Sequence, residues 1–90
     1  MELENRVALV LGAVKGIGKG IGLALADKKA NLILTRHDWE DAFDQMETDF
    51  CATGAKHHII TADLRNIKHV QQVARLIRDR YGKLDILINN

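Results

Sequence analysis

The 90-residue sequence contains no proline, one cysteine, one tryptophan and one tyrosine. The lone thiol of Cys51 excludes an internal disulfide and a cysteine-rich zinc site, so we expect it to be inert in a reducing compartment. No run approaches the roughly 18 to 20 consecutive apolar residues of a membrane helix, and the first residues lack the apolar core of a secretory signal. These absences predict a cytoplasmic protein with no membrane partner.

An excess of charge of one sign is also missing. Thirteen Lys and Arg residues face twelve Asp and Glu residues, for a net charge of +1. A chain with this balance has no basic face for a nucleic-acid backbone, so nucleic acid is excluded as a partner. The four histidines have no spacing that would bring two of them onto a metal, and no metal site is expected.

The apolar runs and the amphipathic segments alternate along the chain. Strands are expected at 7–11, 32–35, 58–61 and 84–88. Helices are expected at 17–29, from a cap at Asp38 to Gly54, and from a cap at Asn66 to Gly82. The pattern predicts an α/β fold with helices on both faces of a parallel four-stranded sheet in the order 3-2-1-4. Without a linker or repeat, residues 1–90 are interpreted as a single unit.

Each predicted helix has one apolar face. The residues assigned to these faces are Ile17, Ile21, Ala24 and Leu25 in the first helix, Trp39, Phe43, Met46 and Phe50 in the second, and Ile67, Val70, Val73, Ala74 and Ile77 in the third. We expect these faces to pack on the sheet, and the acidic side of the second helix to face solvent. Ligands of such sheets bind beyond the carboxyl ends of the strands, where the strand order reverses.

A glycine-rich turn follows the first strand. Gly12, Gly16 and Gly18 are spaced Gly-x3-Gly-x-Gly and open the first helix. Glycines at such a turn let the backbone approach a pyrophosphate, which binds the free amides of the helix N-terminus. The alternative is that they serve only a tight turn and close packing. No Gly-x4-Gly-Lys-Ser/Thr sequence exists, which disfavours a P-loop phosphotransferase.

Two cations lie where a dinucleotide would extend. Lys15 is inside the glycine turn, and Arg36 follows the second strand, where an acid would bind the ribose 2′-hydroxyl of NAD. A guanidinium binds a 2′-phosphate instead, so the pair favours NADP(H) over NAD(H) unless both are solvated surface charges. Arg36 also disfavours a methyltransferase that binds S-adenosylmethionine, because that class needs an acid at this position.

Polar side chains follow the other two strands. Asp63, beside Leu64, can accept a hydrogen bond from an adenine amino group, or it can cap a loop or the following helix. Asn89 and Asn90 can contact a ligand or pair with the loop backbone. The residue types alone leave both choices open.

Taken together, four segments resemble the short-chain dehydrogenase/reductase family. They are Gly12 to Gly18, Arg36, Asp63-Leu64, and Gly82 to Asn90, which is similar to the family's stretch ending in Asn-Asn-Ala-Gly. The resemblance covers nearly the whole chain and implies a Rossmann-like three-layer half. It also implies roles for nine residues: Gly12, Gly16, Ile17 and Gly18 line the pyrophosphate, Lys15 and Arg36 select NADP(H), Asp63 and Leu64 hold the adenine, and Asn90 touches the adenosine ribose.

The sequence also departs from the family pattern. Leu11 replaces a threonine and Val14 replaces a hydroxyl that many NADP-dependent members have, which implies weaker cofactor binding. The family's catalytic Ser and Tyr-x3-Lys are not found, and the tyrosine that is present, Tyr81, has Asp85 four residues later. No catalytic residue is assigned. The first hypothesis is therefore the N-terminal, NADP(H)-binding portion of an oxidoreductase that interconverts carbonyls and alcohols, inactive as this chain alone.

The second hypothesis is an interaction module without a cofactor. The predicted strand at 84–88 would form an open, apolar edge of the sheet. Unpaired edges of this kind favour pairing with another chain. This hypothesis predicts a homo-oligomer.

Overall fold

The computed structural model describes residues 2–90. The elements, in chain order, are β1 (Val7–Val10), α1 (Gly16–Asp27), β2 (Asn31–Arg36), a 3-10 turn (Glu40–Ala42), α2 (Phe43–Ala52), β3 (His57–Thr61), α3 (Ile67–Arg80) and β4 (Ile86–Ile88). Strands and helices therefore alternate as predicted, with ends that differ from the prediction by up to two residues at the strands and slightly more at the second helix.

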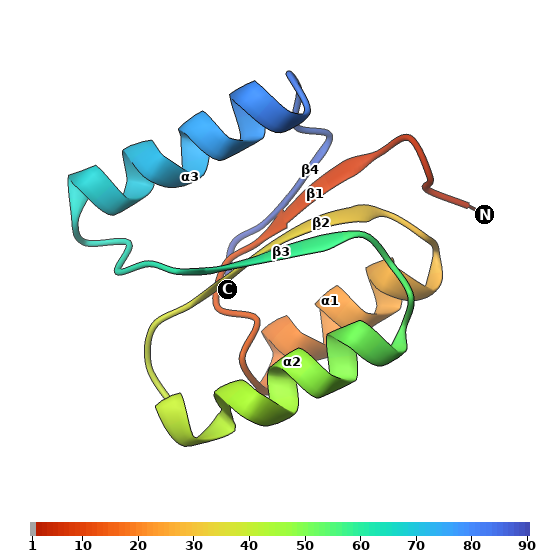
Figure 1. Cartoon of the computed structure of the whole chain (residues 1–90), viewed down its shortest axis with the longest axis horizontal. Helices are drawn as coiled ribbons and strands as arrows, with labels where there is room; N and C mark the ends of the chain where they lie inside the picture. The colour runs from red at the N-terminus through yellow and green to blue at the C-terminus, as the bar shows by residue number, and fades with distance from the viewer. Residues whose placement is uncertain (1) are drawn as a thin grey trace.

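The four strands form one parallel sheet in the order β3-β2-β1-β4, which confirms the predicted topology (Figure 1). In register, Val10 lies beside Leu34 of β2 and Ile88 of β4, so these strands end at the same edge. At the opposite edge the carboxylate of Asp85 accepts a hydrogen bond from the Val7 amide at 2.8 Å. That hydrogen bond lowers the pKa of Asp85 and fixes the start of β4 beside β1.

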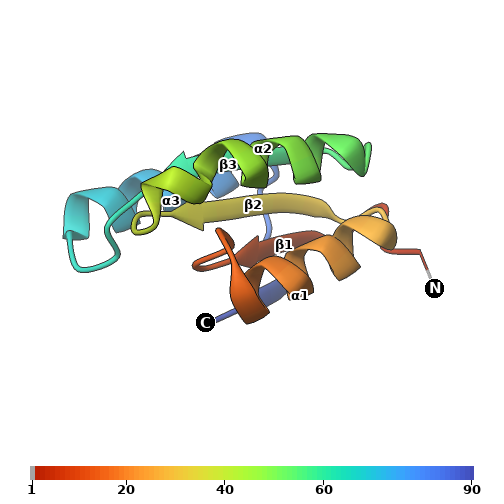
Figure 2. The same ribbon diagram turned by 90° about the horizontal axis from the view of Figure 1, so that it is seen from below.

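Helices cover both faces of the sheet. Figure 1 shows α3 on one side and α1 with α2 on the other, and Figure 2, seen from below, has α1 and α2 in front. The face under α1 and α2 is a core that includes Leu32, Leu34 and Phe50. The face under α3 is a smaller core that includes Ile33, Val73 and Ile77. The sheet is therefore the middle layer of three, with helices on both sides of it.

Helix α1 buries mainly small residues, which corrects part of the predicted face. Its buried residues are Gly18, Gly22 and Ala26, and Leu25 of the predicted face packs partly buried against the same core. The Ile17 side chain is 76% exposed, and Ala24 is exposed as well. A Cβ on Gly22 would lie 2.9 Å from Cζ of Phe50, so the helix approaches α2 too closely for a larger side chain. Close approach, rather than large apolar side chains, determines which face of α1 is buried.

The start of α2 also differs from the prediction. Asp38 does not cap the helix, because a 3-10 turn precedes it and no side chain makes a capping hydrogen bond. Trp39 adopts the left-handed conformation, with φ of 67°, which is unusual for a bulky residue. The Trp39 side chain is 58% exposed and does not belong to the buried face of α2. Of the predicted apolar face, only Met46 and Phe50 are fully buried.

Helix α3 begins as predicted. The Oδ1 atom of Asn66 accepts a hydrogen bond from the Lys68 amide at 2.9 Å, which confirms Asn66 as the cap. Of the predicted apolar face, Val73 and Ile77 are buried, but Ile67, Val70 and Ala74 are exposed. Within residues 2–90, no helix has the length and apolar character needed to cross a membrane.

Candidate functional site

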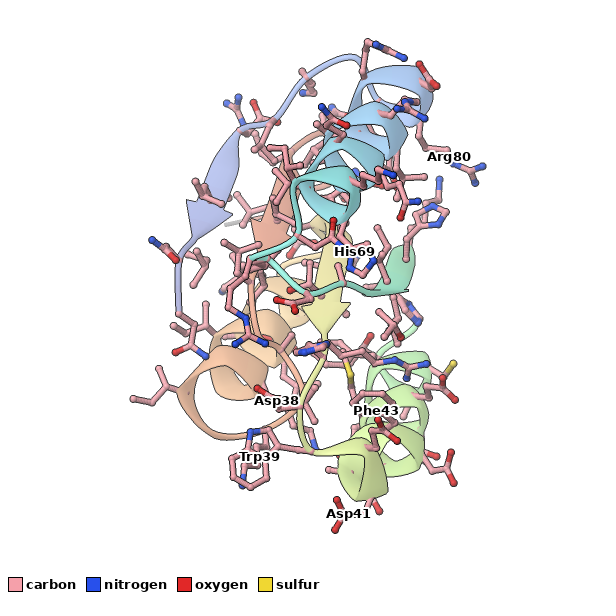
Figure 3. All side chains as sticks on the ribbon, turned by 90° about the vertical axis from the view of Figure 1, so that its left-hand side faces the viewer. Asp38, Trp39, Asp41, Phe43, His69 and Arg80 are labelled. Atoms are coloured by element: carbon pink, nitrogen blue, oxygen red, sulfur yellow. The ribbon has the colours of Figure 1, made fainter. Side chains whose placement is uncertain are left out.

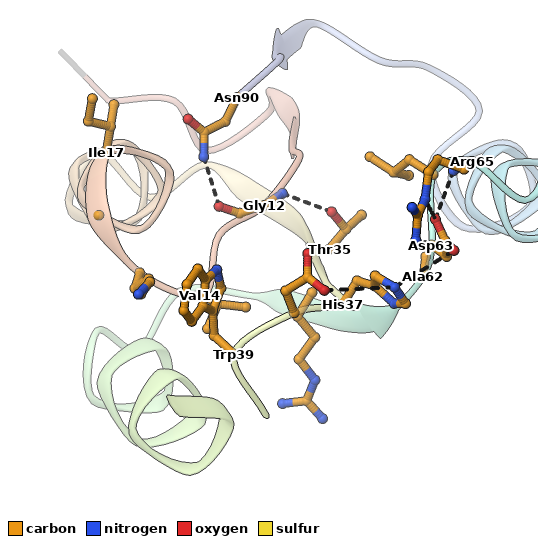
Figure 4. A pocket seen from close by; sticks show the side chains of 15 residues that line it. Gly12, Val14, Ile17, Thr35, His37, Trp39, Ala62, Asp63, Arg65 and Asn90 are labelled. Atoms are coloured by element: carbon orange, nitrogen blue, oxygen red, sulfur yellow. Dashed lines mark hydrogen bonds and ion pairs between the residues drawn. The ribbon is translucent and has the colours of Figure 1, made fainter. Parts of the chain in front are cut away.

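A groove of about 560 Å³ lies beyond the carboxyl ends of the strands (Figure 4). Its lining includes eight residues assigned from the sequence: Gly12, Lys15, Gly16, Ile17, Arg36, Asp63, Leu64 and Asn90. The ninth, Gly18, is buried beneath the turn and does not line the groove. The fold therefore brings residues from all four segments to one surface.

The glycine turn is held by neighbours on both sides. Gly12 has a positive φ of 71°, and its amide donates to Oγ1 of the buried Thr35 at 3.0 Å. Its carbonyl accepts a hydrogen bond from Nδ2 of Asn90 at 3.1 Å. A Cβ on Gly18 would lie only 2.2 Å from that carbonyl oxygen, so only glycine fits there without a backbone shift. The Asn90 side chain thus binds the backbone of the turn, which is one of the two roles considered from the sequence.

The turn delivers the N-terminus of α1 to the groove. Lys15 is the cap residue in an extended conformation, and no side chain caps the helix. Uncapped first-turn amides and the positive end of the helix dipole together form an anion-binding site. Val14 is buried in the core while also lining the groove, and the Ile17 side chain extends to solvent. The chemistry of this donor set fits a pyrophosphate.

Arg36 is at the edge of the groove but is already paired. Its Nη1 donates to Oε1 of Glu47 at 2.8 Å and its Nε donates to Oγ1 of Thr61 at 3.2 Å. The guanidinium also lies 4.3 Å from the ring centroid of Phe43. The Arg36 side chain is only 17% exposed. Its hydrogen bonds to α2 and β3 use part of its capacity to bind a ligand.

Lys15 is held differently. Its Nζ atom lies over the Trp39 ring, 3.3 Å from the ring centroid. Figure 3 shows Trp39 protruding from the loop between β2 and α2, with Asp38 beside it. Lys15 comes from the β1–α1 turn, so this contact joins two neighbouring loops that both line the groove.

Asp63 and the residues that contact it form another side of the groove. Arg65 donates from its backbone amide and from Nε to Oδ1, and from Nη2 to Oδ2, at 2.9 to 3.2 Å. These hydrogen bonds lower the pKa of Asp63 to about 2. The Asp63 amide donates to Nδ1 of His69 at 2.8 Å, and Nε2 of His37 lies 3.7 Å from Oδ2. Asp63 is ionised at neutral pH, and its oxygens face Arg65 as well as the groove.

Several residues that line the groove were not assigned from the sequence, among them Thr35, His37, Trp39 and Arg65. Thr35 had a signal, because a polar residue at the end of a buried strand needs a hydrogen-bonding partner. Arg65 had one as well, since a cation two residues after Asp63 lies within reach of its carboxylate. The position of Trp39 had no such signal, because it depends on a left-handed residue that the apolar spacing does not indicate.

Tyr81 lies away from the groove. It follows α3 and makes an edge-to-face contact with His58, with ring centroids 6.3 Å apart. Burial and the nearby Arg80 lower the pKa of His58. Figure 3 shows Arg80 at the opposite end of α3 from His69, which contacts the groove wall. Within residues 2–90, no three His, Cys, Asp or Glu side chains gather in a way that could hold a metal ion.

Comparison with known proteins gives one family. Residues 6–90 match the family described as short chain dehydrogenase. A hydroxynaphthalene reductase-like protein Arp2 from Metarhizium anisopliae is 34% identical over 88 residues, which are 98% of this chain and 33% of that protein. Oxidoreductase UcpA from Escherichia coli is 33% identical over 89 residues, which are 99% of this chain and 33% of that protein. The chain spans about a third of the length of the curated relatives it matches.

Solved structures agree in fold. A short-chain dehydrogenase/reductase from Serratia marcescens superposes with a TM-score of 0.86 at 32% identity, covering 100% of this chain and 37% of that one. A metagenomic short-chain oxidoreductase in complex with NADP superposes with a TM-score of 0.85 at 30% identity, covering 98% of this chain and 39% of that one.

Proposed function

The chain belongs to the short-chain dehydrogenase/reductase family, and we propose that residues 1–90 form the N-terminal, NADP(H)-binding portion of an oxidoreductase. In the complete protein this portion would hold the adenosine and pyrophosphate of the cofactor. When bound, NADP(H) supplies or accepts a hydride in the interconversion of a carbonyl and an alcohol.

One observation carries this proposal. The groove joins an uncapped helix N-terminus, two glycines with positive φ, and Asn90 on the carbonyl of Gly12. The space above Gly18 is filled by backbone, so the turn is tight. A tight turn that opens a helix after the first strand gives amide donors to a diphosphate. The NADP complex of a relative supports the choice of ligand.

Lys15 and Arg36 support NADP(H) over NAD(H). Both line the groove, Arg36 from the end of β2 and Lys15 from the β1–α1 turn, where it contacts Trp39 of the β2–α2 loop. The ribose 2′ position of a bound dinucleotide would lie near these residues. A 2′-phosphate adds negative charge there, and both cations attract it. Asp63 and Leu64 on the opposite wall would bind the adenine edge and face, and Asn90 would border the ribose.

The chain is proposed to bind without turnover. Its single tyrosine, Tyr81, contacts His58 at the end of α3 and does not line the groove. The groove therefore offers no tyrosine to hold or move a proton at a reacting oxygen. A rate above background with NADPH and simple carbonyl substrates would contradict this part of the proposal.

Calorimetric titration of the 90-residue chain tests the proposal. NADPH and NADH are titrated separately at the same low ionic strength. We expect NADPH to bind at least ~tenfold tighter, a difference of about 1.4 kcal/mol, and Arg36→Ala to reduce the difference. Lys28→Ala is the matched control, because Lys28 follows the opposite end of α1 and should leave both affinities unchanged. Absence of binding by both dinucleotides would reject a cofactor-binding role.

A second candidate function rests on the edge strand. Among the described residues, β4 pairs with β1 alone, and Leu87 within it is 56% exposed. An open apolar edge favours pairing with a second copy of the chain. Light scattering over a dilution series would show a dimer that dissociates on dilution and is weakened by Leu87→Lys. A monomer at every concentration would reject this candidate.

A further inference from the structure

The cations that line the groove are not equally available to a ligand. Arg36 pairs with Glu47 at 2.8 Å, and Arg65 pairs with Asp63 at 3.0 Å. His37, which is a cation only when protonated, lies 3.7 Å from Asp63 and 4.0 Å from Asp38. Among residues 2–90, no carboxylate forms an ion pair with Lys15.

Lys15 is instead fixed by an uncharged partner. The Trp39 ring lies 3.3 Å from its Nζ atom, and the indole is available for this because the left-handed turn at Trp39 keeps it out of the core. The face of an aromatic ring attracts a cation through its quadrupole and does not cancel the charge. The ammonium is thus positioned without a counter-ion, and its full charge remains for a ligand.

From this contrast we propose that Trp39 is the positioning residue that sets the preference for a 2′-phosphorylated dinucleotide, by holding Lys15 at the groove. The inference rests on the proposed cofactor role and refines it. From the sequence, the preference for NADP(H) was attributed to Lys15 and Arg36, and Trp39 was expected in the core. In this assignment Lys15 presents the uncompensated charge, and Arg36 contributes less because Glu47 competes for it.

The physical basis is preorganisation. A free lysine side chain loses rotamer freedom when it binds a phosphate, and a side chain already held over a ring loses less. Removing the ring should therefore weaken the contact with the 2′-phosphate and leave contacts with the rest of the nucleotide unchanged.

The test compares two probes that differ by one phosphate, adenosine 2′,5′-bisphosphate and adenosine 5′-monophosphate, titrated into the 90-residue chain. Trp39→Leu keeps apolar bulk and removes the ring face, and Trp39→Phe keeps a weaker one. We expect Trp39→Leu to lower the affinity for the bisphosphate about three- to fivefold and to leave the affinity for the monophosphate unchanged. Trp39→Phe should give an affinity for the bisphosphate between those of the wild type and Trp39→Leu. Phe43→Leu removes the ring next to Arg36 and serves as the matched control, with a smaller effect expected.

A double-mutant cycle shows whether Trp39 acts through Lys15. In a Lys15→Met background, Trp39→Leu should have no further effect on the bisphosphate. An undiminished effect in that background, or an equal loss for both probes in the wild-type background, would overturn the inference. Since Trp39 is the only tryptophan, its fluorescence should change with the bisphosphate and less with the monophosphate. If neither probe binds the wild-type chain while it remains folded, the proposed function itself fails.

Discussion

Gly22 of α1 faces the ring of Phe50 of α2 so closely that a Cβ on Gly22 would lie 2.9 Å from Cζ and 3.1 Å from Cε1. Phe50 is fully buried, so its ring has little room to move. Gly22→Ala should therefore destabilise the fold by about 1 kcal/mol, because strain from overpacking exceeds the gain in helix propensity. Urea denaturation measures this change in the free energy of unfolding.

Gly20 provides the control within the same helix. No atom lies within 4 Å of a Cβ placed there, so Gly20→Ala should stabilise α1 by about 0.5–1 kcal/mol. Opposite signs for the two substitutions would establish that the glycine at position 22 is required for packing. Equal stabilisation by both would contradict the close approach of α1 and α2.

Gly18→Ala should strongly weaken NADPH binding as well as reduce stability. The new Cβ would lie 2.2 Å from the Gly12 carbonyl oxygen and 2.6 Å from Nδ2 of Asn90, so the turn must move. A displaced turn no longer aims its amides at a pyrophosphate. The expected result is at least a tenfold loss of NADPH affinity by calorimetry.

Gly22→Ala separates binding from stability in that experiment. Gly22 is on the side of α1 that contacts Phe50, away from the groove lining. Its substitution should lower stability while NADPH affinity stays within twofold of wild type, about 0.4 kcal/mol. Comparable loss of affinity in both variants would mean that stability alone controls binding.

The architecture could be predicted because it depends on patterns along the chain. Apolar runs such as 32–35 predict buried parallel strands, and the handedness of βαβ connections then fixes the strand order. Asn66 was predictable as a cap because a helix-starting asparagine acts through its own neighbours. The position of the groove that forms the candidate site was also predictable, since parallel strands all end at one edge of the sheet.

Other features depend on contacts between elements. The buried face of α1 could not be predicted from its apolar residues, because Gly18 and Gly22 gain their role only from what lies opposite. Likewise, the pairing of Arg36 with Glu47 needs the docking of α2 beside β2. Trp39 is not part of the predicted apolar face because its own backbone is left-handed, and the spacing of apolar residues does not indicate such a conformation.

Glu47→Gln should increase affinity for the 2′-phosphate. The carboxylate of Glu47 accepts a hydrogen bond from Nη1 of Arg36, and replacing it with a neutral amide weakens the pairing with the guanidinium and reduces negative charge near the groove. Ion pairs at a protein surface contribute at most about 1 kcal/mol, and the Glu47 side chain is 49% exposed, so we expect the affinity for adenosine 2′,5′-bisphosphate to rise about two- to threefold. Calorimetry against adenosine 5′-monophosphate shows whether the gain requires the 2′-phosphate.

Glu40→Gln makes the same change of charge without releasing Arg36. Glu40 lies in the 3-10 turn before α2 and is exposed. If Glu40→Gln raised the affinity as much as Glu47→Gln, net charge rather than release of Arg36 would be the cause. A gain that is found with Glu47→Gln and lost when Arg36→Ala is added would establish the competition.

The Asp63–Arg65 pair predicts a pH dependence on the acid side. Arg65 lowers the pKa of Asp63 to about 2, below the value of ~3.9 of an unfolded chain. Because the folded state holds the proton less tightly, this pair stabilises the fold above pH ~4, and its contribution is lost as the pH falls from there through about 2. Arg65→Met should raise the pKa of Asp63 toward its ordinary value, as measured by NMR titration of the carboxyl carbon.

The matched control is Arg78→Met, which removes an exposed arginine paired with Asp79 on α3. It should leave the pKa of Asp63 at about 2, because Arg78 is not among the groups that lower it. Arg65→Met should also make the loss of stability between pH ~4 and about 2 shallower, since less of the proton linkage remains. If the pKa of Asp63 stayed at about 2 in Arg65→Met, hydrogen bonds from Arg65 would not be its cause, and His37 at 3.7 Å would become the next residue to substitute.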